Sequence, residues 1–222
     1  MQYRKMPNTK EQLSALGYGV MRMPTKRGKA GGMTTLIDAE KSKKLIRYAI
    51  DNGVNYLDTA YPYHRGTSES FLGEHVLPDG YREKVFIATK MPTFSINKTE
   101  RFNEIFEKQL KKLKVDYIDY YLMHSLDGST WGKMKGLGVI EWMDKVRAQG
   151  KVKKIGFSFH GLHDEFKQIV DEYDWEFVQV QYNILDIDFQ AGIKGIRYAH
   201  SKGLGVIVME PLRGGALVGK MP

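Results

Sequence analysis

Four side chains in this sequence could together deliver a proton to a carbonyl oxygen: a phenol, an ammonium, a carboxylate and an imidazole. The phenol is Tyr63, which follows Asp58 by five residues, and Lys90 and His124 each end a later apolar run. A phenol with a pKa of about 10 is a weak acid at neutral pH, but a neighbouring cation stabilises the phenolate and helps the proton to leave. The set predicts Tyr63 as general acid, Lys90 as its cation, Asp58 as the partner of Lys90, and His124 as the group that orients a carbonyl oxygen.

Taken singly, these residues have ordinary explanations. An Asp after a strand commonly caps a turn, a Lys there is usually solvated, and a His more often forms a local hydrogen bond than it catalyses. Their combination is more specific, because Asp58, Lys90 and His124 end three consecutive apolar runs. If those runs are neighbouring barrel strands, their ends meet in one pocket.

The elements that must position these side chains alternate along the chain. Short apolar, β-branched runs predict strands, and the longer segments between them carry apolar residues at helical spacing. Seven strands are predicted, at residues 16–22, Val54 to Asp58, Val85 to Lys90, Tyr117 to His124, Val152 to Ser158, Phe177 to Tyr182 and Gly205 to Met209.

Such βα units form either an open doubly wound sheet or a closed barrel. Polar residues end nearly every predicted strand, as expected for a barrel, and the first strand is not followed by the GxGxxG of the open dinucleotide-binding fold. We therefore expect an α/β fold, a TIM (β/α)8 barrel, in a single domain over residues 1–222. Residues 1–14 are expected to form a hairpin that plugs the bottom, and the eighth βα unit is expected to lie outside this sequence or to be absent.

Composition narrows the class of protein. A hydrophobic fraction of 42% and an aromatic fraction of 12% suit a globular core. The net charge is +8, but its densest run, residues 108–114, has Leu110 and Leu113 at helical spacing, which indicates a solvated helix face rather than a nucleic-acid patch. The chain has no cysteine, no apolar signal segment and no run of the ~20 apolar residues that span a bilayer, so we expect a cytoplasmic protein with no membrane partner.

Several segments resemble the motifs of aldo-keto reductases. The catalytic tetrad motifs of that family resemble Tyr56-Leu-Asp-Thr-Ala-Tyr-Pro-Tyr63, Ala88-Thr-Lys90 and Tyr121-Leu-Met-His124. The resemblance continues through Leu16-Gly-Tyr-Gly19, Lys154-Ile-Gly-Phe-Ser158, Val180-Gln-Tyr-Asn183 and Glu210-Pro-Leu-Arg-Gly-Gly215, and so covers nearly the whole chain. It implies hydride transfer from a nicotinamide cofactor to an aldehyde or ketone, with Tyr63, Lys90, Asp58 and His124 in the roles given above.

The same resemblance implies a set of cofactor contacts. Ser158 and Gln181 match positions that hold the nicotinamide carboxamide, and Met209 stands where the family often has an aromatic that stacks on the ring. The remaining implied contacts are Gly19, Met21, Arg22 and Asp58 near the ring and Pro211, Leu212 and Gly214, with Arg213 nearby, along the pyrophosphate.

NADP(H) is the expected cofactor, with NAD(H) left open, and the expected partner is a small-molecule carbonyl substrate. The chain resembles a microbial branch of the family most at two segments, Phe157-Ser-Phe-His-Gly161 and Met209-Glu-Pro-Leu-Arg-Gly-Gly215. Longer members of that branch append a cysteine-rich, ferredoxin-like segment, so an iron-sulfur cluster is expected only if a further segment carries it. Phe94 and Trp131 are candidate pocket walls. The natural substrate and the oligomeric state are left unassigned.

Two other functions stay open at this point. One is a nucleotide-binding, redox-sensing module that keeps the reductase scaffold with little turnover. The other is a metal-dependent TIM-barrel hydrolase, suggested by six histidines that include His124, His160 and His163. The second reading leaves Tyr63 and Lys90 without a role, and we expect no metal site.

Overall fold

The computed structural model describes residues 1–26 and 36–219 and contains a seven-stranded, all-parallel sheet. Neighbouring strands follow the order of the chain, from β3 to β9, as a succession of βα units requires. The strands are β3 (Tyr18–Gly19), β4 (Tyr56–Asp58), β5 (Phe86–Met91), β6 (Ile118–Leu126), β7 (Val152–Phe159), β8 (Phe177–Gln181) and β9 (Gly205–Met209). All seven predicted strands are present.

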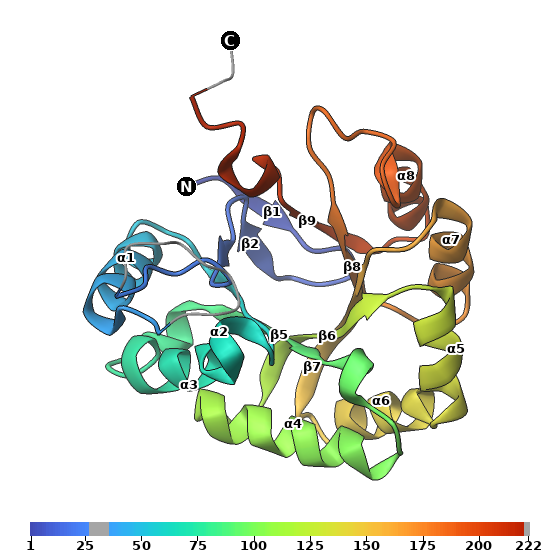
Figure 1. Ribbon diagram of the computed structural model, residues 1–222, viewed down its shortest axis with the longest axis horizontal. Coiled ribbons are helices and arrows are strands. Elements are labelled where there is room, and N and C mark those ends of the chain that lie inside the picture. Colours follow the sequence, from blue (N-terminus) through green and yellow to red (C-terminus); the bar gives the residue numbers. More distant parts are fainter. Residues whose placement is uncertain (27–35, 220–222) are drawn as a thin grey trace.

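Helices cover the outer face of this sheet. In Figure 1 they form an arc around the strands, from α1 through α4 and α6 to α8. The longer ones are α1 (Ala39–Asp51), α4 (Glu100–Leu113), α5 (Gly128–Gly136), α6 (Val139–Ala148), α7 (His163–Asp171) and α8 (Gly192–Ser201). Short helical turns complete the connections at α2 (Tyr63–Gly66), α3 (Ser68–Phe71), η1 (Leu72–Val76), η2 (Arg82–Lys84), η3 (Thr93–Ser95) and η4 (Arg213–Gly215).

The strand register places the predicted site residues on the inner face of the curled sheet. Asp58 pairs with Ala88, Lys90 with Leu122, and Gln181 with Met209. Because side chains alternate between the two faces of a strand, the residue two places beyond an inner one is again inside. The inner face therefore changes from apolar at the start of the strands to polar at their carboxyl ends.

The apolar end of this inner face is packed against the amino-terminal hairpin. Strands β1 (Tyr3–Lys5) and β2 (Gln12–Ser14) pair antiparallel, and Met6 and Leu13 join a buried cluster with inner residues of the sheet. Those inner residues are Tyr56, Ala88, Tyr120, Leu122 and Phe177. A larger core fills the space between the outer face of the sheet and the helices.

The sheet is open between β3 and β9. These two strands stand at the ends of the strand order, and within residues 1–26 and 36–219 no ladder joins them. The fold is thus a (β/α)8-type barrel with seven strands in place and the closing unit not among them. No helix in the described part of the chain is long and apolar enough to cross a membrane.

Candidate active site

Lys90 is the centre of the polar end of the barrel. Its side chain is 1% exposed, and its ammonium donates to both carboxylate oxygens of Asp58, at 2.7 and 2.8 Å, and to the carbonyl oxygen of Thr59 at 2.7 Å. Burial by itself lowers the pKa of Lys90, but the Asp58 carboxylate and the Tyr63 hydroxyl outweigh it, so the pKa lies above its ordinary value. A buried cation that is paired and fully hydrogen-bonded stays charged.

Tyr63 makes a weaker contact with Lys90 than Asp58 and Thr59 do. An ammonium has three protons, and the three short contacts to Asp58 and Thr59 use them, so the contact from Lys90 Nζ to the Tyr63 hydroxyl is long, at 3.5 Å. Burial raises the pKa of Tyr63, whereas the positive charge of Lys90 lowers it, and the result lies above the ordinary value. Lys90 thus acts on the phenol in the direction expected of a neighbouring cation, but the burial of the phenol has the larger effect on its pKa.

The backbone around Tyr63 is unusual for its residue types. Tyr63 opens the turn α2, its N–H donates to the Ala60 carbonyl, and the next two residues are left-handed, with φ of 50° at His64 and 56° at Arg65. Residues other than glycine adopt such angles rarely and only where surrounding contacts impose them. This turn brings the phenol back toward the end of β5, which explains how a residue beyond β4 reaches Lys90.

His124 completes the group from β6. Its ring centroid is 6.2 Å from that of Tyr63 in an edge-to-face arrangement. Burial, reinforced by the positive charge of Lys90, lowers the pKa of His124 from 6.5 to about 3, so the imidazole is neutral. The register between β6 and β7 shifts between Met123 and Leu126, the segment that contains His124, and Ser125 has a φ of 55°. A bulge of this kind re-aims side chains at the rim of a sheet.

Two residues that the sequence analysis did not select support this group. Gln179, on β8, donates from Nε2 to Asp58 Oδ2 at 2.9 Å. On the other side, Gln109 of α4 donates to the Lys90 carbonyl oxygen at 3.0 Å and to Glu69 at 2.6 Å. Glu69 is fully buried and also accepts from Thr89 at 2.7 Å. A buried carboxylate with such partners fixes the segments that carry them.

The residues expected near a cofactor occupy the same rim. Gly19 lies beside Asp58 in the β3–β4 register, and a side chain placed on Gly19 would have no neighbour within 4 Å. The Arg22 guanidinium lies close to Gly214, where an added Cβ would be 3.2 Å from Nη2. Ser158 is buried, and its hydroxyl accepts from the Ser125 N–H at 2.8 Å.

The remaining members of that set come from β3, β8 and β9. Met21 follows β3 and is half-buried, and Met209 ends β9 opposite Gln181. Pro211 and Leu212 are exposed in the turn that follows. All the expected cofactor residues therefore gather at the carboxyl ends of the strands.

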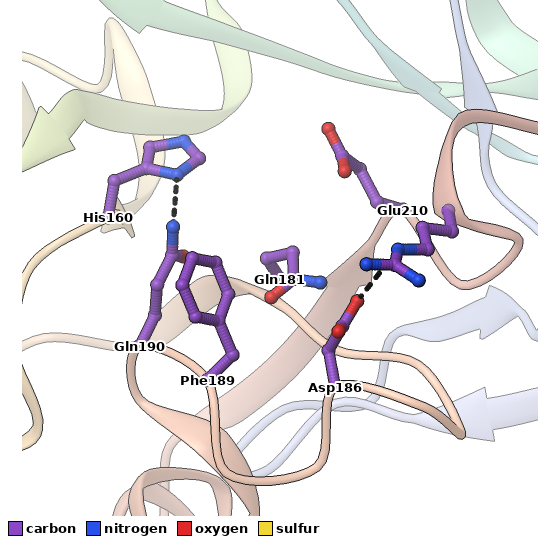
Figure 2. Close-up of a pocket in the computed structure, with 7 residues that line it drawn as sticks. His160, Gln181, Asp186, Phe189, Gln190 and Glu210 are labelled. Atoms are coloured by element: carbon purple, nitrogen blue, oxygen red, sulfur yellow. Dashed lines mark hydrogen bonds and ion pairs between the residues drawn. The ribbon is translucent and has the colours of Figure 1, made fainter.

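A cavity of about 290 Å³ opens among the loops after β7, β8 and β9. Figure 2 shows its lining, with Gln181 between His160 on one side and Glu210 on the other. Asp186 and Arg213 form an ion pair at 3.3 Å across part of it, and Phe189 and Gln190 complete the wall. Burial lowers the pKa of His160, although the negative charge of Glu210 opposes the shift.

Of the two aromatic pocket walls expected from the sequence, Phe94 lies beside His124, whereas Trp131 lies in the helical layer. Phe94 is 62% exposed, and its ring centroid lies 6.0 Å from that of His124. Trp131 is 1% exposed, belongs to α5 and packs against Trp175 in the helical layer. No helix was predicted at α5, and the expectation that Trp131 forms a pocket wall is wrong because its indole belongs to the core.

The histidines do not assemble into a metal site. In the described part of the chain no group of three or more His, Asp or Glu side chains is arranged to hold an ion. His163 lies at the start of α7, where it contacts Asp164. The geometry gives the hydrolase alternative no support.

Comparison with known proteins identifies the family. A sequence model of the aldo/keto reductase family matches residues 15–222. Among curated relatives, aldo-keto reductase YhdN of Bacillus subtilis is 27% identical over all of this chain and 65% of its own length, and the uncharacterized oxidoreductase YrpG of the same organism is 30% identical over 99% and 69%. The solved holo form of aldo-keto reductase AKR11C1 from Bacillus halodurans has a TM-score of 0.80 at 24% identity, covering 98% of this chain and 68% of that one. The chain belongs to the aldo/keto reductase family, and it spans about two thirds of the length of these relatives.

Proposed function

We propose that this protein reduces aldehydes or ketones to alcohols with NADPH, and that Tyr63 donates the proton. The observation that carries the proposal is the contact chain from Asp58 through the buried Lys90 to Tyr63, with the neutral His124 beside the phenol. A buried cation next to a phenol is arranged to stabilise the phenolate that proton donation leaves behind.

A nicotinamide cofactor suits the residues around this group. The amide oxygen Oε1 of Gln181 is buried and has no hydrogen-bond partner among the described residues, so it could accept from a carboxamide NH2. The open space over Gly19 leaves room for a ring beside Asp58. Arg22 and the left-handed turn at Gly214 offer a cation and backbone donors to a phosphate. We propose Ser158, Met21, Met209, Pro211 and Leu212 as further contacts.

The chain's own residues account for the proton half of the reaction. When bound, the reduced nicotinamide would supply the hydride that goes to the carbonyl carbon. His124, neutral and held beside Tyr63, would donate a hydrogen bond to the carbonyl oxygen and orient it. Tyr63 would transfer its hydroxyl proton to that oxygen as the C–O double bond becomes single, and Lys90 would stabilise the resulting phenolate. Asp58 would keep Lys90 in place.

The test is Tyr63→Phe, which removes the donated proton and little else. Oxidation of NADPH by an activated aldehyde should fall by about 100-fold or more, because general acid catalysis contributes that much. The affinity for NADPH, measured by fluorescence titration, should change little. Tyr61→Phe is the matched control, because it removes the hydroxyl of a tyrosine two residues away. The ring of Tyr61 contacts Lys112 and not Lys90.

The outcomes separate the alternatives. Unchanged turnover in Tyr63→Phe would exclude Tyr63 as the acid. Wild-type protein that binds NADPH tightly but leaves it reduced in a single-turnover experiment would indicate a nucleotide-binding sensor instead. Dissociation constants for NADPH and NADH, measured side by side, test the proposed preference for the phosphorylated cofactor.

A further inference from the structure

Glu210 is a carboxylate at the mouth of the site that the proton-transfer mechanism does not use. It directly follows β9 and lines the cavity shown in Figure 2. Among the described residues its carboxylate forms no hydrogen bond or ion pair, since the neighbouring Arg213 pairs with Asp186 instead. The cavity therefore presents a negative charge that no residue of its wall neutralises.

Glu210 has a backbone conformation that glutamate rarely adopts. Its φ is 58°, a left-handed value that residues other than glycine, Asn and Asp rarely adopt. The Glu210 carbonyl oxygen accepts from the Arg213 N–H at 2.8 Å, which closes the turn. Strained backbone of this kind persists where the rest of the structure imposes it, and it is common at ligand sites.

The rest of the cavity wall is also rich in acceptors. The buried Oε1 of Gln190 lacks a partner among the described residues, in addition to the Gln181 Oε1 that is proposed above to contact the cofactor. The Nε2 of Gln190 is already 3.3 Å from the Nδ1 of His160. With Asp186 and Arg213 cancelling each other and His160 neutral at neutral pH, Glu210 leaves the wall with one net negative charge.

This charge acts on the proposed reacting centre. The negative charge of Glu210 reaches two groups there: it adds to the burial that raises the pKa of Tyr63, and it opposes the burial that lowers the pKa of His160. The nearby ion pair of Lys90 with Asp58 has no net charge, and Arg22 lies against Gly214, where the proposed cofactor phosphate would neutralise it. A substrate whose carbonyl oxygen contacts Tyr63 therefore enters a field of negative sign.

We propose that Glu210 determines substrate class: it makes the site favour carbonyl compounds that are cationic or rich in hydrogen-bond donors and disfavour those that carry a carboxylate. The inference rests on the proposed function, because it places the substrate carbonyl at Tyr63. Glu210 acts here through charge and through acceptance of hydrogen bonds, and it takes no part in the transfer of the proton.

The test compares two aldehydes of similar shape and opposite charge, para-trimethylammoniobenzaldehyde and para-carboxybenzaldehyde. For each protein the ratio of kcat/KM values, cation over anion, is measured at low salt, and the ratio of dissociation constants is measured by NMR titration without turnover. Because each ratio is compared between proteins for the same two substrates, differences in intrinsic reactivity and in cofactor binding cancel.

Glu210→Gln should lower both ratios by roughly three- to tenfold, the range expected for one partly screened charge. Glu210→Asn should do the same, and it suits the left-handed backbone better, so it serves if the first variant folds poorly. Glu83→Gln is the matched control, because it removes an exposed carboxylate just before the amino end of β5, whereas Lys90 lies near the carboxyl end. It should leave both ratios unchanged.

The wild-type ratios should also fall at high salt toward the values of the Glu210 variants, because salt screens the charge. Ratios that are the same in wild type and both Glu210 variants, or that do not respond to salt, would overturn the inference. If no aldehyde is turned over but the ratio of dissociation constants shifts as expected, the proposed reaction fails while the charge selection stands. If turnover is normal and neither ratio shifts, only the charge selection fails.

Discussion

At the scale of single residues, burial and hydrogen-bond partners together determine the protonation states in the candidate site. Lys90 remains charged because Asp58 and Thr59 satisfy its three protons, whereas His124 remains neutral because burial disfavours its cation. The same burial that holds Tyr63 also raises its pKa. In the proposed reaction, Lys90, Tyr63 and His124 would therefore start as an ammonium, a phenol and a neutral imidazole.

His124 should give the protein a specific loss of stability in acid. Its pKa is about 3 when folded and 6.5 ordinarily, so between these values the unfolded chain binds a proton that the folded one does not. The unfolding free energy gained from the neutral imidazole is complete above pH 6.5 and is lost as the pH falls toward 3. His124→Gln should lower the slope of unfolding free energy against pH by about 1.4 kcal/mol per unit between roughly pH 6 and 4.

Urea titrations at several pH values, followed by tryptophan fluorescence, measure that slope. His75→Gln serves as the control, because His75 is half-buried in η1 and lies outside the site. Parallel slopes for wild type and His124→Gln would show that the imidazole is protonated normally in the folded protein.

At the scale of elements, the buried carboxylate of Glu69 ties three segments to the site. Glu69 belongs to α3, Gln109 to α4, and Thr89 and Lys90 to β5, while the Tyr121 hydroxyl of β6 donates to Gln109 at 2.5 Å. No single contact in this network touches the proposed substrate. Its effect is to fix the main chain from which Lys90 projects.

Gln109→Leu should therefore reduce both stability and turnover. The change leaves Glu69, Tyr121 and the Lys90 carbonyl short of partners in a buried place, which should lower the unfolding free energy by about 2–4 kcal/mol. It should lower kcat more than it changes KM, because the change displaces Lys90 and leaves the binding of the substrate in the ground state largely intact. Gln168→Leu, which removes an exposed amide from α7, should do neither. Equal losses in the two variants, or a full kcat in Gln109→Leu, would contradict this role.

Sequence reasoning found the strand-end residues of the site but not those inside the elements. Asp58, Lys90 and His124 stand out because a polar residue closes an apolar run. Gln179 has a signal of the same strength, since alternation puts it on the inner face with Phe177 and Gln181, but it lies in mid-strand and was not considered. Glu69 lies near the start of a helix, where an acidic residue is usually exposed, and its burial depends on packing against Gln109.

Helix α5 was missed for a local reason. Gly128, Gly132 and Gly136 recur along it, and glycine in a helix interior obscures the pattern of helix formers. The usable signal was Asp127, whose side chain caps the helix by accepting from the Thr130 N–H at 2.7 Å. Recognition of that cap would have placed Trp131 in the helical layer rather than in a pocket wall.

At the scale of the whole molecule, the described residues leave two strand edges without partners, β3 and β9. Val208, in β9, is 40% exposed. Unpaired edges with apolar side chains pair readily with other chains. We therefore expect these 222 residues, expressed as such, to self-associate.

Val208→Lys should reduce that association, because a charge on an edge strand disfavours pairing with another edge. Light scattering coupled to size-exclusion chromatography measures the change. Val218→Lys is the control, since it adds the same charge at an exposed position outside the strands. If the control suppresses association equally, net charge rather than the β9 edge is responsible; a monomeric wild type would refute the expectation.

The long contact between Lys90 and Tyr63 bears on how the site recovers after each reaction. Every alcohol formed by the proposed route would leave Tyr63 one proton short, and neither Lys90, whose three protons point at other oxygens, nor the neutral His124 is placed to return that proton. We therefore expect the proton to come from water, which has to reach Tyr63, a residue that is 9% exposed. Each cycle of the proposed reaction would thus take one proton from solvent at Tyr63. Because the bound product would cover Tyr63, release of the product would have to precede this reprotonation.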